Sequence, residues 1–373
     1  MEGGVGAYSR ELAYALANQG HSVFIYTDKR ADSAREHGIR VMAEVRDWNW
    51  AALVSARRWA QTYELDIVNL QYEAAAYGTA PFIHLIPSRF TDVPLVTTFH
   101  DLLVPYLFPK AGALRYQAVL NLARTVQGVI VTNPADAAQL NQEKGIAPLR
   151  EIPIGSNIRP MPPQGYHRTI WRENLDIPAD AYLVGYFGFL NVTKGVDTLI
   201  RAFNTLVKQG ENAYLLLIGG RSGDSDASNA RHADEVDDLI ARLHLRTRIR
   251  RTGFVPDDAV SGHLLACDVL ALPYTDGLSL RRGSLMAGLV HGCAIISTLP
   301  KTPLVEVLHG QNLYLVPPDS PEALGAALRQ LAHDTDLRAK LGAGAKKLSE
   351  LFTWDRIASR TAEFFTEILH TKS

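Results

Sequence analysis

Seven glycine and polar residues stand together between two apolar segments in the C-terminal third of the chain. They are Asp276, Gly277, Ser279, Arg281, Arg282, Gly283 and Ser284. Glycine lets a ligand approach the backbone closely, and the free N–H groups at a helix start bind anions. An arginine guanidinium holds phosphate through two parallel hydrogen bonds. These residue types in one short loop indicate a site for a phosphorylated ligand.

Two further glycine-rich turns precede predicted helices, at Gly3–Gly6 and at Gly188–Gly195. One such turn is weak evidence, because a glycine between strand and helix is usually structural. Three of them, spread over two domains, predict a cleft for a phosphorylated ligand. Lys194 stands just before Gly195, where its charge opposes the helix dipole unless an anion is bound. A solvated lysine is the alternative explanation.

Two titratable residues follow predicted strands in the N-terminal half of the chain. His100 ends the segment 94–100, and Glu73 follows the segment 66–72. In open α/β folds, ligands bind outside the carboxyl ends of the parallel strands. We therefore expect His100, and more weakly Glu73, to contribute to the site, although either residue could be incidental.

Other kinds of chemistry find no support in the sequence. The remaining histidines lack the spacing of metal ligands, and the chain has neither a Walker loop nor a nucleophile elbow. We therefore expect no metal and no cofactor. A net charge of −1 provides no global field that would recruit nucleic acid.

Two arginine-containing segments allow a functional and a structural explanation. Trp48, Trp50 and Trp59 stand near Arg57 and Arg58, which suits a peripheral contact with a membrane surface. The structural explanation, which we favour, is a helix packed on a sheet with its basic face in solvent. The four arginines of residues 246–253 are typical of a solvated strand edge.

Segments of strand length alternate with amphipathic helical segments along the chain. The apolar segments are residues 21–27, 66–72, 94–100, 128–133, 150–155, 182–188, 213–220, 268–274, 293–298 and 312–318. Strands that are apolar on both faces and separated by helices predict parallel sheets covered by helices. A proline-rich segment without periodicity, residues 158–167, predicts a linker between two α/β halves. Residues 352–370 predict a long amphipathic helix opened by Thr353.

The composition agrees with this organisation. A chain of 373 residues with 47% hydrophobic and 21% charged content suits two soluble domains. Cys267 and Cys293 each lie in an apolar segment, which predicts buried free thiols in a reducing compartment. No apolar segment approaches the roughly 20 residues that span a bilayer. We expect a cytoplasmic protein, with the inner face of the membrane as its one other candidate location.

The glycine turn at residues 3–6 has no strand before it. In a doubly wound sheet the first strand is usually central. We therefore expect that the natural first strand lies upstream of Met1, as roughly six to ten apolar residues. A stop codon directly before Met1 would refute this expectation.

Several landmarks occur in an order that resembles glycosyltransferase family 4. They are "GGVGAYSRELAYALANQGHSVFIYT", "TTFHD", "IPIGSN", "GFLNVTKGVDTLIRAF", "LLLIGG", "RTGFVPDDAV", "DVLALPYTDGLSLRRGS", "HGCAIIST" and "FTWDRIA". The resemblance covers nearly the whole chain. It implies the α/β GT-B fold, with two Rossmann-like domains facing across a cleft. The implied domains are residues 1–160 with 355–373, on the acceptor side, and residues 161–354, which bind the nucleotide sugar.

The resemblance also implies roles for individual residues. Gly3 and Gly4 would approach the donor phosphates or sugar, His100 would contact the sugar, and Lys194 would neutralise the diphosphate. The turn at Gly188 would border the donor, Phe254 and Val255 would frame the base, and the amides of Gly277, Leu278 and Ser279 would meet the leaving phosphate. The implied reaction is a metal-independent transfer of a hexose, with retention, from a nucleotide diphosphate sugar. The acceptor would be a saccharide or a lipid-linked molecule in cell-envelope or exopolysaccharide synthesis. The leaving phosphate would accept the acceptor proton.

The sequence departs from the family pattern in two places. Phe189 stands where an arginine is usual, and the usual pair of glutamates is reduced to Asp276 and Ala287. An alanine cannot accept hydrogen bonds from a ribose. We therefore expect a variant subgroup, in which Arg281 or Arg282 supplies the missing cation and Ser279 or Ser284 contacts phosphate or ribose. Solvated or ion-paired arginines are the alternative. A non-catalytic binding protein and a sugar-nucleotide 2-epimerase remain alternative functions.

Overall fold

The computed structural model describes residues 4–31, 33–36, 38–78, 80–102, 112–221 and 227–371. The chain divides into two compact units. The N-terminal unit comprises Met1–Gly155 with Thr353–Ser373, and the C-terminal unit comprises Ser156–Phe352. The boundaries therefore fall at residues 155/156 and 352/353, beside the sequence-based boundaries at 160/161 and 354/355.

The C-terminal unit is built on one parallel sheet in the order β10-β9-β8-β11-β12-β13. Its strands are β8 (Tyr182–Phe187), β9 (Ala213–Ile218), β10 (Ile249–Gly253), β11 (Val269–Leu272), β12 (Ile295–Thr298) and β13 (Tyr314–Val316). The chain runs outward from β8 to β9 and β10, then returns to β11 on the other side of β8. This is a doubly wound sheet, whose strand order reverses between β8 and β11.

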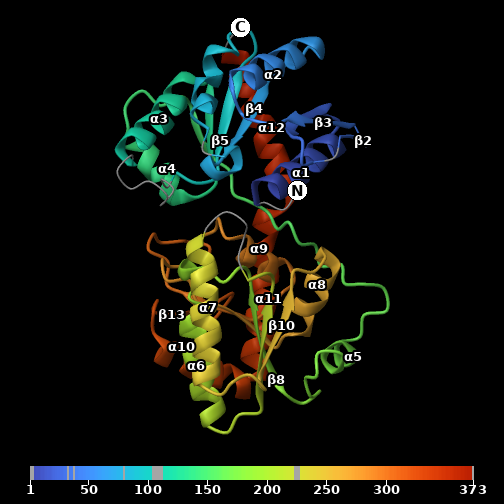
Figure 1. Ribbon diagram of the computed structural model, residues 1–373, viewed down its shortest axis with the longest axis vertical. Coiled ribbons are helices and arrows are strands. Elements are labelled where there is room, and N and C mark those ends of the chain that lie inside the picture. Colours follow the sequence, from blue (N-terminus) through green and yellow to red (C-terminus); the bar gives the residue numbers. More distant parts are fainter. Residues whose placement is uncertain are drawn as a thin grey trace. The chain divides into compact units, whose positions relative to one another are not determined.

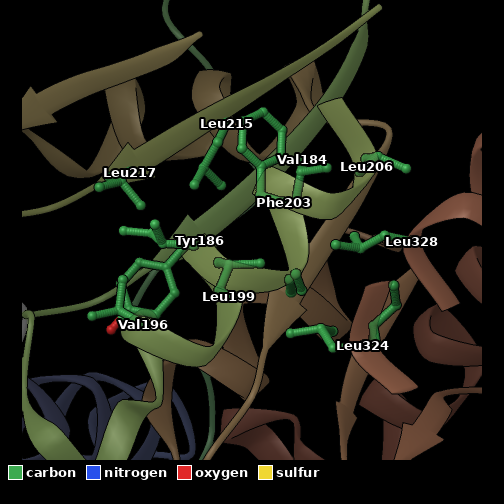
Figure 2. Packing of buried hydrophobic residues seen from close by; sticks show 14 of the residues in the cluster. Val184, Tyr186, Val196, Leu199, Phe203, Leu206, Leu215, Leu217, Leu324 and Leu328 are labelled. Atoms are coloured by element: carbon green, nitrogen blue, oxygen red, sulfur yellow. The ribbon is translucent and has the colours of Figure 1, made fainter. Parts of the chain in front are cut away.

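Helices cover both faces of this sheet. On one face lie α6 (Val196–Lys208), α7 (Ala227–Arg242) and α10 (Pro321–His333), whose apolar residues form one core with the sheet. In α6 the buried apolar residues recur at helical spacing, as at Val196, Leu199 and Phe203. Figure 2 shows these side chains directed toward Tyr186 and Leu215 of the strands. The core therefore fixes the start of α6 against the end of β8.

The other face carries α8 (Asp257–Ala266) and α9 (Gly283–Val290). Gly288 of α9 lies so close to Leu270 and Ile295 that an added Cβ would be 2.6 Å from the Leu270 side chain. The remaining helices of this unit are α5 (Arg168–Glu173), α11 (Thr335–Ser349) and the short turns η4 (Val192–Lys194) and η5 (Glu350–Phe352). Figure 1 shows α6 and α7 side by side on the surface of the unit.

The N-terminal unit contains two sheets. A parallel sheet in the order β4-β5-β6-β7 consists of β4 (Val68–Tyr72), β5 (Leu95–Phe99), β6 (Gly128–Val131) and β7 (Leu149–Glu151). A second sheet, in the order β1-β3-β2, consists of β1 (Val23–Asp28), β2 (Ala34–Glu36) and β3 (Ile39–Val45), with β2 antiparallel. Strands β1 and β4 are therefore end strands.

Helices enclose both faces of the N-terminal unit as well. On one face, α1 (Gly4–Asn18) and α12 (Trp354–Thr371) pack against each other and against Val96 and Ile130 of the sheet. In Figure 1 these are the dark blue and red helices of this unit. On the other face lie α2 (Trp50–Thr62), η1 (Ala74–Tyr77), η2 (Pro81–Ser88), α3 (Gly112–Thr125) and α4 (Pro134–Asn141). The predicted C-terminal amphipathic helix is thus confirmed as α12.

The two arginine-containing segments occupy structural positions. Trp59 of α2 is buried, and Trp48 and Trp59 pack against Tyr26 of β1. Strand β10, which contains Arg250 and Arg251, is the end strand of its sheet, as the sequence predicts. None of the helices in the described part of the chain has the length and apolar character that crossing a bilayer requires.

Candidate functional site

The candidate site lies at the carboxyl end of β8 and β11, where the strand order of the C-terminal unit reverses. Ligands of doubly wound folds bind at this point, because the connections on either side diverge and leave a crevice. The turn after β8 and the loop after β11 contact each other here. The Thr275 N–H donates to the Thr193 carbonyl at 3.2 Å. A Cβ on Gly195, which has φ of 64°, would lie 1.9 Å from the Pro273 carbonyl oxygen. Only glycine permits this contact.

A chain of polar contacts connects the two turns. Lys194 Nζ lies 3.4 Å from Ser284 Oγ, and Ser284 Oγ lies 2.8 Å from the Tyr274 hydroxyl. Lys194 precedes α6, and Ser284 lies in the first turn of α9. The N-termini of α6 and α9 therefore lie close to the Lys194 ammonium group. This arrangement favours the binding of an anion.

Burial has an electrostatic consequence for Lys194. Burial and then the neighbouring Arg282 lower the pKa of the lysine while Asp276 opposes the change, and together they place it at about 8. Within the described parts of the chain, no carboxylate lies at ion-pair distance from the Lys194 ammonium. The site thus holds a cation that burial makes less favourable, and Asp276 acts on it from beyond ion-pair distance while it pairs with Arg282.

Arg282 and Asp276 form an ion pair beside this lysine. Both Asp276 carboxylate oxygens accept hydrogen bonds from the Arg282 guanidinium. The Arg282 guanidinium also lies 4.8 Å from the centroid of the Tyr274 ring, and Lys194 Nζ lies 5.2 Å from it. The ion-paired arginine that the sequence leaves as an alternative is therefore present for Arg282.

The backbone of the 276–284 loop is closely packed. Gly277 has φ of 83°, and an added Cβ would lie 2.8 Å from the Leu299 carbonyl oxygen. Leu278 is buried, while Ser279 and Arg281 are partly buried. The Arg281 N–H lies 3.5 Å from Ser279 Oγ, at the limit of a hydrogen bond. The glycine at 277 is thus required by the turn itself, whatever it binds.

The other predicted residues of this unit lie along the same sheet edge. Gly188 follows β8 and has φ of 138°. A Cβ added to Gly219 would lie 3.2 Å from the Gly188 carbonyl oxygen. Phe254 and Val255 follow β10, at the end of the sheet, and the Phe254 side chain is 73% exposed. Phe189 is also exposed. Ala287 is fully buried in α9, so a substitution there would act on the core.

In the N-terminal unit, His100 and Glu73 follow the adjacent strands β5 and β4. His100 Nε2 lies 2.9 Å from Gln71 Oε1, and the ring lies 4.6 Å from that of Tyr8. Burial lowers the pKa of His100 to about 4, so the imidazole is neutral near pH 7. The pKa of Glu73 is raised by burial and then by the nearby charge of Asp101.

Of the two predicted site glycines in this unit, Gly4 is described by the structure and Gly3 is not. Gly4 begins α1, and a Cβ added there would meet open space. Gly3 lies outside the described residues. The turn at the start of α1 therefore places no steric demand for glycine at position 4.

Sequence reasoning missed four residues that contact the predicted ones. Tyr274 contacts Ser284, Lys194 and Arg282, and Tyr8 and Gln71 contact His100. Asn191, in the turn before Lys194, has a buried Oδ1 without a partner in the described chain. Tyr274 carried one usable signal, because it is the first polar group after an apolar strand.

Comparison with known proteins agrees with this architecture. The sequence model for glycosyltransferase family 4 matches residues 2–158, and that for group 1 glycosyl transferases matches residues 167–348. The D-inositol 3-phosphate glycosyltransferase of Xylanimonas cellulosilytica is 26% identical, over 98% of this chain and 92% of its own length. The corresponding enzyme of Kineococcus radiotolerans is 24% identical, over 100% of this chain and 92% of its own length.

Solved structures show the same fold. Sucrose-phosphate synthase from Thermosynechococcus elongatus superposes with a TM-score of 0.79 at 21% identity, over 99% of this chain and 94% of its own. The Anabaena protein HepE, in complex with UDP and glucose, gives a TM-score of 0.77 at 20% identity, over 98% of this chain and 97% of its own. Both halves of the chain match family models in the order that the motifs predict, and the C-terminal unit has the predicted parallel sheet covered by helices. The chain belongs to glycosyltransferase family 4 and has the α/β GT-B fold.

Proposed function

We propose that this glycosyltransferase moves a hexose from a nucleotide diphosphate sugar to a saccharide or lipid-linked acceptor, and that the edge of β8 and β11 binds the donor diphosphate. The observation that carries this proposal is Lys194. Its ammonium stands at the start of α6 with Ser284 as its hydrogen-bond partner. A partly buried cation without an ion-paired acid among the described residues is unfavourable in the free protein and is compensated when an anion binds.

The charge balance of the site supports a ligand with more than one negative charge. Lys194 and Arg282 contribute two cations, Asp276 contributes one anion, and the N-termini of α6 and α9 add positive partial charge. Arg282 Nε and Asn191 Oδ1 are buried and lack partners among the described residues. Buried polar atoms rarely remain unpaired in folded proteins, so a bound donor would complete the site.

These groups are suited to stabilising a leaving diphosphate. Charge develops on the phosphate as the sugar–phosphate bond breaks, and preorganised N–H groups with a cation stabilise it. We propose retention of configuration, with the leaving phosphate accepting the acceptor proton, because the Asp276 carboxylate of this site is already paired with Arg282. We also propose that no metal is required, since Lys194 and the helix termini supply the positive charge.

The nucleotide and the acceptor are proposed by analogy. The similar Anabaena protein has been solved with UDP and glucose, so UDP-glucose is the first donor to test. A saccharide or lipid-linked acceptor of cell-envelope or exopolysaccharide synthesis follows from the family. A non-catalytic sugar-nucleotide-binding protein is the second candidate, favoured by Ala287, whose side chain is fully buried where the family usually places a glutamate.

The decisive experiment compares Lys194→Met, just before α6, with Lys208→Met, an exposed control at the end of α6. Binding of UDP, GDP and ADP and of their sugars is measured by thermal shift and calorimetry. We expect Lys194→Met to weaken binding of the preferred nucleotide about 10- to 100-fold, the range for a lost charge-assisted hydrogen bond. The control should bind like the wild type. Equal binding by both variants would contradict the proposed site.

The pH dependence provides an independent check. The lysine binds an anion in its charged form, so wild-type affinity should fall as the pH rises through about 8, by up to about tenfold per pH unit. Lys194→Met should show no such fall.

The stability of the free protein should respond to pH in the opposite direction. A lowered pKa in the folded state means that stability is fully present above the unfolded value, near 10.5, and is lost as the pH falls through 8. Lys194→Met should therefore stabilise the free protein at pH 7.

Turnover separates the enzyme from the binding protein. Donor hydrolysis or transfer to an acceptor should occur in the presence of EDTA, and NMR of the product should show the anomeric configuration of the donor. Tight nucleotide binding without any turnover would favour the non-catalytic alternative. An inverted product would refute the proposed stereochemistry alone.

A further inference from the structure

The Lys194–Ser284–Tyr274 chain contains more hydrogen-bond donors than acceptors. Lys194 carries an ammonium, which can only donate. Ser284 and Tyr274 each carry one hydroxyl proton and one oxygen that can accept. Lys194 points its donor at Ser284 Oγ, which also contacts the Tyr274 hydroxyl. Within the described chain, neither hydroxyl has a hydrogen-bond acceptor outside this trio.

Only two arrangements of the hydroxyl protons are available. If Ser284 donates to Tyr274, the tyrosine proton is left without an acceptor. If Tyr274 donates to Ser284, the serine proton is left without one. Tyr274 is 0% exposed and Ser284 is 7% exposed, so an unpaired proton costs more on the tyrosine. The geometry therefore favours Tyr274 as the donor.

This assignment leaves the serine proton available beside the lysine. Ser284 lies in the first turn of α9, and the Lys194 ammonium lies 3.4 Å from its oxygen. A ligand with only acceptor oxygens would satisfy both groups at once. The Tyr274 ring also lies against Lys194 and Arg282, with the cations 5.2 and 4.8 Å from its centroid. Contact with the ring face is attractive for both cations and holds two like charges near each other.

We propose that Tyr274 is a positioning residue of this site: its hydroxyl turns the Ser284 proton toward a bound diphosphate, and its ring holds Lys194 and Arg282 beside that ligand. The inference rests on the proposed donor site and adds a residue that acts through its neighbours. Tyr274 does not itself touch the ligand. A substitution that keeps only the volume of the Tyr274 side chain should therefore not preserve ligand binding, because the hydroxyl and the ring act separately.

A double-mutant cycle separates positioning from a general structural role. Binding of UDP, GDP or ADP, whichever binds the wild type most tightly, is measured for Tyr274→Phe, Ser284→Ala and the double variant. We expect each single change to weaken binding about five- to tenfold, the effect of one hydrogen bond. Because Tyr274 acts through Ser284, the double variant should be no weaker than Ser284→Ala alone.

Controls make each outcome informative. Tyr182→Phe removes a buried hydroxyl that has no partner in the described chain, in β8 of the same sheet, and should leave affinity unchanged. Additive losses in the cycle, or an unchanged affinity in Tyr274→Phe, would overturn the inference. Absence of nucleotide binding in the wild type would instead refute the proposed donor site and this inference with it.

The ring is tested separately from the hydroxyl. Tyr274→Leu removes the face that holds both cations, so it should weaken binding more than Tyr274→Phe does. It should also steepen the loss of affinity with salt, since the cations are no longer held in place. If Tyr274→Leu and Tyr274→Phe bind equally at matched stability, the ring has no positioning role.

Discussion

The two units differ at the place where a doubly wound sheet binds its ligand. In the C-terminal unit, β8 lies between β9 and β11, and the sheet continues through the reversal of strand order. In the N-terminal unit, β1 and β4 are instead the end strands of two separate sheets. Helix α1 packs on strands of both sheets, and α2 contributes Trp59 to β1 on the other face.

This difference shows how a central strand positions a site. In the C-terminal unit, β8 connects the glycine turn, Lys194 and the start of α6 to the loop after β11. In the N-terminal unit, β1 is half-buried along its whole length although it contains Val23, Phe24 and Ile25. By contrast β5, which has paired neighbours on both sides, is buried throughout. Apolar strands without a second neighbour keep surface and backbone groups accessible to water.

The largest effect should come from a glycine at a helix start in each unit, Gly195 before α6 and Gly4 at the start of α1. Gly195→Ala places a Cβ against the Pro273 carbonyl at a positive φ, and should lower the free energy of unfolding by about 3 kcal/mol. Gly4→Ala meets open space and should change it by less than about 0.5 kcal/mol. Urea unfolding of the two variants measures both values.

The same pair sharpens the functional comparison. If Gly4→Ala abolishes transfer while its stability is unchanged, Gly4 approaches the donor as the family resemblance implies. If Gly195→Ala is as stable as the wild type, the contact between the two turns of the C-terminal unit does not constrain the backbone there.

The second effect concerns the acid stability of both units. Burial lowers the pKa of His100 in the N-terminal unit and of His263 in the C-terminal unit to about 4. Their ordinary value is 6.5, so the stability that each contributes is complete above that pH and is lost as the pH falls through 4, by up to about 3 kcal/mol. Thermal unfolding between pH 7 and 4 should therefore show a smaller loss for His100→Gln and for His263→Gln than for the wild type.

The two histidines should differ in activity. His263 accepts a hydrogen bond from Trp171 Nε1 in the packing between α5 and α8, so His263→Gln should affect stability alone. His100→Gln should also lower transfer at pH 7 if the histidine contacts the donor sugar. Equal activity of both variants would contradict the role that the resemblance implies for His100.

The smallest effect should appear in hydrogen exchange along β1. The Val23 N–H donates to the Gly38 carbonyl and the Lys29 N–H to the Val45 carbonyl, both on the side of β3. Because successive residues of a strand alternate in direction, the N–H groups of Phe24 and Tyr26 face away from β3, toward the open edge. These two should exchange at least about tenfold faster than the amides of Ile25 and Thr27. In β8, neighbouring Val184 and Gly185 should show no such alternation. Uniform protection along β1 would mean that another group covers the edge.

Sequence patterns predicted much of this fold because the relevant signals are local. Segments that are apolar on both faces identified the strands, and amphipathic segments between them indicated helices such as α6. The order of motifs identified the family, and the arginines of β10 marked an end strand. The separation of β1 from β4 into two sheets was not predicted, because pairing depends on which segments meet in space. The upstream strand itself stays a prediction.

The candidate site shows the limit more clearly. The sequence by itself determined that Lys194, Arg282 and Ser284 stand close to glycines in the connections between apolar strands and the following helices, because residue type and local periodicity are properties of short segments. Only the tertiary structure decided that Arg282 pairs with Asp276, and that Tyr274 joins Ser284 to Lys194. Ninety residues separate Lys194 from Ser284 along the chain, and the parallel pairing of β8 with β11 brings their turns together. Such contacts depend on strand order, which the long-range packing of helices on a sheet selects and no local pattern encodes.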